Sequence, residues 1–345
     1  MDIITRKHTI PFFSSRLTDR YFGGLRLCVF DIETLGLNPS ASEMILAGFL
    51  HVTEDGTAIA RQYFAEKKSD EPQLIAAVNE ELKQCDVLLT YNGKHFDLPF
   101  LEKRAAFHSI PISTRGCSNL DLYLVLHGHS NLKSVLKNLR QKTVEDYMGL
   151  HTDRKDEISG AESIQLYTSF LSEKDTKKKE ALKEKVLLHN HDDLLQLYKL
   201  LPILLQTDLH RAMSYLGFPL AASAGWPQLN LERIRIDFRG LAFHGTYGAP
   251  GFSYLSYDDG SRPFSCQFTP EGDFQFLIPA RRHGSSQYLQ LSDFFEEDTP
   301  FCRLPGYENG FLILVEENRP RYMEINRFVQ IFLRQFTESF PCPRS

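Results

Sequence analysis

The chain is 345 residues long, 42% hydrophobic and 24% charged, which indicates a soluble protein of two globular domains. It has no apolar run of about 18 residues that could span a membrane and no signal-peptide pattern at its start. Its six cysteines lack the paired spacing of zinc sites or disulfide frameworks. A cytoplasmic location is therefore expected. The formal net charge of −5 argues mildly against nucleic acid as a partner, although local patches matter more than the total.

Residues 1–24 are expected to form an N-terminal arm that ends at Gly23-Gly24. The segments that follow alternate between strand and helix patterns, so residues 25–205 are expected to form one domain with a mixed α/β sheet flanked by helices. Strands are expected at 26–33, 43–52, 57–65 and 86–91, with Asp55-Gly56 as a hairpin signal. Helices are expected at 70–84, 97–107, 119–127, 131–140, 160–172 and 176–205.

A smaller β-rich domain is expected over residues 206–345, where the composition changes. Lys199 is the last lysine, and short aromatic runs such as 274–278 are separated by turn sequences, which is typical of antiparallel strands. A last helix is expected at 325–339. The aromatics and arginines suit either a packed core with a solubilising surface or contacts with a nucleic-acid strand, for which Arg281-Arg282 is the best patch.

Two acids stand at the end of the first strand expected in this domain. Asp31 and Glu33 follow the apolar run 27–30, and side chains two residues apart on a strand point to the same face. Neighbouring carboxylates raise each other's pKa unless a cation lies between them, and hard divalent cations such as Mg²⁺ take oxygen ligands. Asp31 and Glu33 are therefore candidate metal ligands if further acids join them, and solvated strand-end residues if none do.

Asp97 is the third candidate acid. It follows the strand expected at 86–91 and the turn Asn92-Gly93, and it stands where an N-cap of the helix 97–107 would, with Pro99 in the first turn. A capping carboxylate is also fixed near a strand end. Structural capping and metal binding are therefore both open for Asp97.

The fourth candidate acid lies in the long helix expected at 176–205. His189 and Asp193 are four residues apart and share a helix face, in a stretch that is otherwise rich in leucine. A helix this apolar is normally buried, and buried Asp and His need partners. Asp193 is the favoured ligand and Asp192 the second choice, while His191 points to a different face of the helix.

The order of these acids resembles that of the DEDD group of ribonuclease H-like 3′–5′ exonucleases, in which four acids hold two metal ions. Within this group the chain is most similar to the YprB-like branch, which includes a bacterial mitomycin-repair exonuclease. The similar segments are 30–37, 91–101 and 189–195, so the resemblance covers residues 25–205. The two familiar forms of the third motif place a histidine five residues, or a tyrosine four residues, before the aspartate. Here a histidine stands four residues before it, as in the YprB-like branch.

The resemblance implies a role for each matching residue. Two ions, Mg²⁺ with Mn²⁺ able to substitute, would be held by Asp31, Glu33, Asp97 and Asp193. His189 would orient or deprotonate the attacking water, since an ordinary histidine pKa of about 6.5 suits proton transfer at neutral pH. Contacts with the substrate are expected at four neighbouring positions, Thr34, Leu35, Asn92 and Phe96.

The implied function is metal-dependent 3′–5′ hydrolysis of nucleic acid. DNA is favoured because the resembling branch includes a repair enzyme, a single-stranded 3′ end is the expected substrate, and a helicase is a candidate partner. Two other hypotheses are open: an exoribonuclease, which uses the same acids, and a catalytically silent nucleic-acid-binding or scaffold protein, against which the complete set of acids counts. The lysine run 177–179 is either a solvated surface or a contact with the nucleic-acid backbone.

Overall fold

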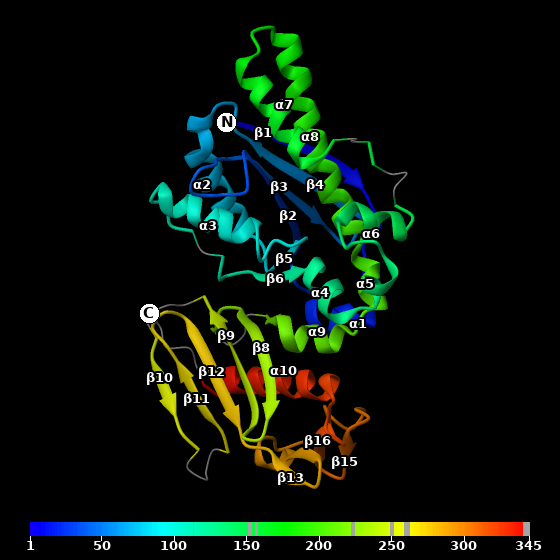
Figure 1. Cartoon of the computed structure of the whole chain (residues 1–345). Helices are drawn as coiled ribbons and strands as arrows, with labels where there is room; N and C mark the ends of the chain where they lie inside the picture. Colours follow the sequence, from blue (N-terminus) through cyan, green and yellow to red (C-terminus); the bar gives the residue numbers. More distant parts are fainter. Residues whose placement is uncertain are drawn as a thin grey trace. The chain divides into compact units, whose positions relative to one another are not determined.

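The computed structural model describes residues 1–112, 114–150, 154–155, 158–221, 225–248, 252–258 and 263–340. The chain divides into two compact units, Met1–Thr207 and Asp208–Ser345. The first unit is an α/β unit, and the second is rich in antiparallel strands (Figure 1). None of the helices in the described ranges combines the length and the apolar character needed to cross a membrane.

A six-stranded mixed sheet forms the centre of the first unit (Figure 1). The strand order is β1-β4-β3-β2-β5-β6. The strands span Asp2–Thr9 (β1), Leu27–Thr34 (β2), Met44–Val52 (β3), Thr57–Phe64 (β4), Val87–Thr90 (β5) and Ser118–Asp121 (β6). The pairs β1–β4, β4–β3 and β3–β2 are antiparallel, whereas β2–β5 and β5–β6 are parallel, so β2 lies where the two pairing modes meet.

Helices pack against both faces of this sheet. They span Arg16–Phe22 (α1), Glu71–Leu82 (α2), Asp97–Phe107 (α3), Leu122–His129 (α4), Leu132–Val135 (α5), Gln141–Tyr147 (α6), Gly160–Ser172 (α7) and Thr176–Lys199 (α8), with short 3-10 helices at Lys68–Asp70 and Leu201–Gln206. On one face, α2 and α3 pack on Cys28, Phe30 and Ile32 of β2. On the other face, α7 and α8 pack on Leu46 of β3 and Phe64 of β4.

The predicted mixed sheet flanked by helices is confirmed, and β2 to β5 and α2, α3 and α7 lie close to their predicted positions. Three segments differ. Residues 119–121 belong to β6 rather than to a helix, because the Asp121 side chain accepts a hydrogen bond from the Leu124 N–H and caps α4. The helix expected at 131–140 is only the short α5. The long helix ends at Lys199, and a 3-10 helix follows in which Pro202 lacks the N–H of a continuing α-helix.

The N-terminal residues belong to the sheet of the first unit and do not form a separate arm. Strand β1 pairs with β4 along its whole length, Asp2–Thr9 against Thr57–Phe64, and α1 follows it. Alternate residues of β1 are exposed, as expected for an edge strand. Polar residues occur at both odd and even positions of β1, so its sequence lacks the alternation of polar and apolar residues that would indicate a strand.

The described residues of the second unit form two antiparallel sheets and two α-helices. The sheet orders are β10-β11-β12-β9-β8-β7 and β13-β14-β16-β15, with β17 paired to β16. The strands span Phe218–Leu220 (β7), Leu229–Asp237 (β8), Gly240–Tyr247 (β9), Tyr254–Ser256 (β10), Ser265–Phe268 (β11), Asp273–Ile278 (β12), Arg281–His283 (β13), Ser286–Gln290 (β14), Tyr307–Glu308 (β15), Phe311–Glu316 (β16) and Arg319–Pro320 (β17). The helices are Leu209–Leu216 (α9) and Tyr322–Ser339 (α10), with a short 3-10 helix at Leu291–Asp293. The β-rich character predicted for this part of the chain is confirmed.

Aromatic side chains fill the core of the second unit. The rings of Phe276 and Phe336 lie 5.1 Å apart in an edge-to-face arrangement, and the Phe268 ring is stacked on Phe336 at 5.8 Å. These rings join the sheet to α10. The aromatic residues Phe268 and Phe276 therefore pack in the core and are not available to contact a nucleic-acid strand. Tyr257, by contrast, is exposed.

Candidate metal centre

Strand β2 carries the first two candidate acids at its C-terminal end. Asp31 is half-buried and Glu33 is buried, and both contact residues of α8. In the antiparallel pairing with β3, Asp31 lies opposite Gly48 and Glu33 opposite Leu46. The register shifts immediately after Glu33, so the acids stand beside an irregularity in the sheet.

Asn190 of α8 holds the Asp31 carboxylate. Its Nδ2 donates to Asp31 Oδ2 at 2.8 Å, and its Oδ1 accepts a hydrogen bond from Gln62 Nε2 of β4, also at 2.8 Å. A side chain at Gly48 would collide with Asn190, so the glycine allows α8 to pack this closely on β3. Sequence patterns do not single out Asn190 or Gln62, because their contact depends on how closely α8 packs on the sheet.

Asp97 reaches across to β2 instead of capping its own helix. It is the first residue of α3, the N-cap is Phe96, and no side-chain capping bond forms there. The buried Asp97 carboxylate accepts a hydrogen bond from the Ile32 N–H at 3.2 Å. Asp97 is therefore fixed beside the backbone that separates Asp31 from Glu33.

His189 and Asp193 face Glu33 from one side of α8. His189 Nε2 lies 3.6 Å from Glu33 Oε1 and 3.6 Å from Asp193 Oδ2. The guanidinium of Arg154 forms an ion pair with Asp193 and also contacts Glu145 at 2.7 Å and 2.8 Å. Glu33, His189 and Asp193 offer ligand atoms that all lie within 4.8 Å of one another.

Asp192, the second choice for the fourth ligand, points to different partners. Its Oδ2 accepts a hydrogen bond from the Lys155 N–H at 2.6 Å, and its Oδ1 lies 3.4 Å from His191 Nδ1. His191 in turn contacts His8 of β1 at 2.9 Å. The structure therefore brings Asp193, and not Asp192, to Glu33 and His189.

The electrostatics of these acids favour a bound cation. Burial raises the pKa of Asp31 well above its ordinary value, and repulsion from Asp97, Asp193 and Glu33 raises it further. Burial also raises the pKa of Asp97 to about 7, against the lowering effect of the hydrogen bond from Ile32. A divalent cation among these oxygen atoms would relieve the repulsion that the folded chain imposes. The carboxylate donor set thus fits Mg²⁺ or Mn²⁺.

Asp121 is a fifth acid near the centre, and repulsion from it contributes to the raised pKa of Asp97. Burial raises the pKa of Asp121 as well. Its oxygens accept hydrogen bonds from the backbone N–H groups of Asn92 at 2.9 Å, Lys94 at 3.0 Å and Leu124 at 3.2 Å. These bonds hold the turn between β5 and α3, so Asp121 fixes the segment that carries Asp97.

Of the four positions predicted to contact substrate, Thr34 and Leu35 follow Glu33 in the chain, and Asn92 and Phe96 precede Asp97. Thr34 is buried and donates to the Gly36 carbonyl at 2.9 Å, and Leu35 is half-buried beside it. Asn92 occupies the turn after β5 with a positive φ of 65°, and Phe96 packs on the core 5.7 Å from the Phe100 ring. The Thr34 hydroxyl is thus hydrogen-bonded to the backbone two residues further on. The other three side chains are half-buried: Leu35, Asn92 and Phe96.

The fold and this centre define an α/β protein whose mixed sheet presents acids from β2, α3 and α8 together. A family model described as the RNase H superfamily matches residues 28–205. The chain belongs to this superfamily, whose members are typically nucleases that use divalent metals.

Two similar proteins are DNA polymerases of archaea. A DNA polymerase of Methanocaldococcus jannaschii is 33% identical over 97 residues, which make up 26% of this chain and 6% of the polymerase. The solved structure of the family B DNA polymerase of Pyrobaculum calidifontis is 23% identical with a TM-score of 0.41, over 52% of this chain and 25% of that one. The chain thus spans only a small part of either polymerase.

Proposed function

We propose that this protein is a metal-dependent 3′–5′ exonuclease of the YprB-like branch. The observation that carries the proposal is that Glu33 and Asp193 meet at the His189 imidazole, while Asp31 and Asp97, from β2 and α3, are close enough for the acids to repel one another. Membership of the RNase H superfamily supports a nuclease. The direction of degradation and the branch rest on the motif resemblance alone.

In the proposed reaction, a water oxygen forms a bond to phosphorus and the bond to the 3′ oxygen breaks. Divalent ions held by the four acids would activate that water and stabilise the leaving oxygen. His189 Nε2 faces the carboxylates of Glu33 and Asp193, where it can orient the water and accept its proton. The 3′ oxygen takes up a proton from solvent. Asn190 keeps the Asp31 carboxylate oriented for ligation.

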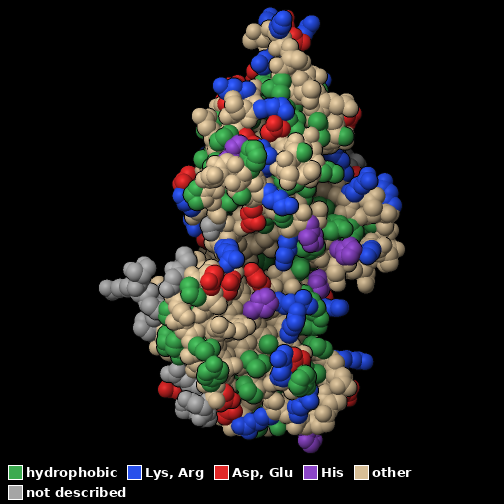
Figure 2. All heavy atoms as spheres, turned by 60° about the vertical axis from the view of Figure 1, so that its left-hand side comes forward, with side chains coloured by type: hydrophobic (Ala, Val, Ile, Leu, Met, Phe, Trp, Pro, Cys, Tyr) green, Lys and Arg blue, Asp and Glu red, His purple; other side chains and the backbone are tan. Residues whose placement is uncertain are grey.

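DNA with a single-stranded 3′ end is the proposed substrate, and a helicase that exposes such an end is the proposed partner. Lys and Arg side chains gather at the tip of the α7–α8 hairpin (Figure 2), where Lys177 and Lys178 are exposed. Lys177 and Asp193 are 16 residues apart on α8, which is about 24 Å. These lysines could contact phosphates several nucleotides away from the cleaved bond.

The test is degradation of 5′-labelled single-stranded DNA, duplex DNA and matched RNA in Mg²⁺, Mn²⁺ and EDTA. We expect a metal-dependent ladder that shortens from the 3′ end with the wild-type protein. Asp31→Asn and Asp193→Asn should abolish it without unfolding the protein. Asp192→Asn is the matched control, because the neighbouring carboxylate has other partners, and it should retain cleavage.

The outcomes separate the hypotheses. Faster loss of RNA than of DNA would replace the DNA exonuclease by an exoribonuclease. Strand binding without cleavage in any metal would favour a silent nucleic-acid-binding protein. An inactive Asp192→Asn protein beside an active Asp193→Asn protein would reverse the assignment of the fourth ligand.

A further inference from the structure

A second cluster of ligand-type side chains lies on the other face of the same sheet. Cys28 of β2 and His51 of β3 are direct cross-strand partners, so their side chains lie side by side on the face that α2 covers. Cys85 joins them from the turn between α2 and β5. The two sulfur atoms and a His51 ring nitrogen all lie within 4.8 Å of one another, and Cys28 Sγ is 3.4 Å from His51 Nε2.

Glu81 of α2 borders the cluster at His51, outside the group of three ligand atoms that all lie within 4.8 Å of one another. Its Oε2 lies 3.2 Å from His51 Nε2. Its other oxygen, Oε1, accepts a hydrogen bond from the Tyr63 hydroxyl at 2.6 Å and pairs with Arg61. The carboxylate is buried, and its orientation is fixed by Tyr63 and Arg61, which leaves Oε2 turned toward the cluster.

The two separations at His51 are compatible with zinc ligation. Zn–S bonds of about 2.3 Å and Zn–N bonds of about 2.0–2.1 Å at tetrahedral angles place sulfur about 3.6 Å from nitrogen, and nitrogen about 3.4 Å from a carboxylate oxygen. The observed separation is 3.4 Å between Cys28 Sγ and His51 Nε2, and 3.2 Å between His51 Nε2 and Glu81 Oε2. Two thiolates with one imidazole select zinc over the hard ions that suit the carboxylate centre.

The sulfur atoms are already held in place by the backbone. Cys28 Sγ donates to the Val29 carbonyl and Cys85 Sγ to the Glu81 carbonyl, each at 3.3 Å. Cys117 Sγ donates to the carbonyls of Leu82 and Cys85 at 3.0 Å and so braces the turn that carries Cys85. A zinc ion would replace the thiol protons of Cys28 and Cys85 without requiring the turn to move.

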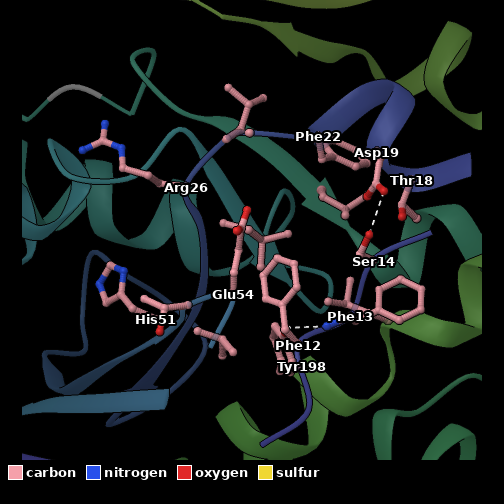
Figure 3. A pocket seen from close by; sticks show the side chains of 18 of the residues that line it. Phe12, Phe13, Ser14, Thr18, Asp19, Phe22, Arg26, His51, Glu54 and Tyr198 are labelled. Atoms are coloured by element: carbon pink, nitrogen blue, oxygen red, sulfur yellow. Dashed lines mark hydrogen bonds between the residues drawn. The ribbon is translucent and has the colours of Figure 1, made fainter. Parts of the chain in front are cut away.

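An ion can reach the cluster from a cavity. His51 is half-buried and lines a cavity of about 830 Å³ together with Arg26, Glu54 and Phe13. Figure 3 shows His51 on the same side of this cavity as Arg26 and Glu54, away from Phe13. The cluster is therefore buried on its cysteine side and accessible on its histidine side.

We propose that Cys28, His51 and Cys85, with Glu81 beside His51, bind one structural Zn²⁺ that ties β2 and β3 to the turn before β5. The site is separate from the carboxylate centre, because Cys28 and the acid pair Asp31 and Glu33 are on opposite faces of β2. Binding of this ion does not depend on nuclease activity.

The test uses the full-length protein purified with a non-thiol reductant and dialysed against EDTA. After addition of zinc and removal of the excess, we expect one zinc per chain by mass spectrometry of the metal. With Co²⁺ in place of zinc, we expect thiolate-to-cobalt charge-transfer absorption and the visible bands of tetrahedral cobalt. The cobalt spectrum of the wild-type chain needs no variant, so a folding defect cannot obscure it.

Variants then assign the ligands. Cys85→Ser and His51→Asn should each lower zinc affinity at least tenfold and weaken or shift the cobalt bands. Cys266→Ser, a buried cysteine of the second unit, and Asp193→Asn, in the carboxylate centre, should leave both unchanged. A wild-type chain that holds no zinc or gives no thiolate-to-cobalt band would overturn the proposal, as would a Cys85→Ser chain that binds zinc as tightly as wild type.

Discussion

Gly48 gives the sharpest test of how the chain positions Asp31. It lies opposite Asp31 in the β2–β3 pairing, and a Cβ placed on it would be 2.2 Å from Asn190 Oδ1 and 2.7 Å from Leu194 Cδ1. Ordinary contact begins at 3.4 Å, so in Gly48→Ala the Asn190 oxygen would have to retreat by about 1.2 Å. That movement would break the hydrogen bond that this oxygen accepts from Gln62 and the one that Nδ2 of the same amide donates to Asp31.

Two free-energy terms follow from this displacement. Overpacking a buried contact costs about 1–3 kcal/mol, and two lost hydrogen bonds cost about 1 kcal/mol each. We therefore expect Gly48→Ala to lower the free energy of unfolding by about 3–5 kcal/mol, the sum of these ranges. A displacement of about 1 Å at an aligned catalytic group reduces the rate by about 10²-fold.

Urea unfolding followed by circular dichroism, together with initial rates of DNA degradation, would measure both effects. Gly128→Ala is the matched control, because Gly128 lies in α4 with nothing within 4 Å of its added Cβ, and alanine there should be neutral or stabilise by up to about 1 kcal/mol. Asn190→Ala should reproduce the loss of rate without overpacking. Wild-type stability and rate in Gly48→Ala would refute both the close packing of α8 on β3 and the positioning of Asp31 by Asn190.

Three further predictions concern single side chains. His189→Ala should reduce the rate of cleavage by roughly 10²–10⁴-fold in single-turnover assays, as expected for a general base, and an unchanged rate would leave His189 with a structural role. Burial raises the pKa of Glu71, but hydrogen bonds led by the one from Arg104 outweigh it and hold this pKa below the ordinary 4.5. Because the pKa of Glu71 is lowered in the folded state, its contribution to stability is complete above pH 4.5 and is lost as the pH falls below that value. Glu71→Gln should be less stable than wild type at neutral pH but should lose less stability on acidification. Urea titrations at several pH values would measure both effects. Arg154→Met should lower the free energy of unfolding, measured in urea, by about 3–5 kcal/mol, because it leaves the buried Glu145 carboxylate unpaired. Adding Glu145→Gln to this variant should recover part of the lost stability. No recovery would mean that Arg154 stabilises the fold through other contacts.

The parts of the fold that sequence predicts well are those with local signals. The apolar run of β2 ends at Asp31 and Glu33, and α3 follows a turn, so the positions of these elements could be read directly. Strand β6 is only four residues long and runs directly into α4, so the helix expected at 119–127 overlaps the end of the strand. The polar edge strand β1 also gives no local pattern, because its stability comes from pairing with β4.

The sequence indicates the acids and His189 of the candidate site, but not the side chains that orient them. Asn190 follows His189 in sequence, yet its contact with Asp31 depends on the distance at which α8 packs on Gly48, which no spacing rule gives. The cysteines show the same limit more clearly. Cys28 and Cys85 are 57 residues apart, and their spacing argued against a metal site, but the register of β2 against β3 and the turn after α2 bring them together with His51.

The alternation of side chains along β2 explains how one strand can serve two centres. Phe30 and Ile32 share a face with Cys28 and pack under α2 and α3, while Asp31 and Glu33 project to α8. A one-residue slip would exchange the two sets, so the register must be fixed at the acid end. The irregularity there, where Glu33 faces Leu46 but Thr34 faces Met44, leaves Ile45 as the extra residue on β3. A bulge increases the local twist of a strand and re-aims neighbouring side chains. This bulge lies beside Glu33, whose carboxylate points toward His189. Cys28 and His51 lie in the regular part of the same strand pair, so the bulge leaves their pairing intact.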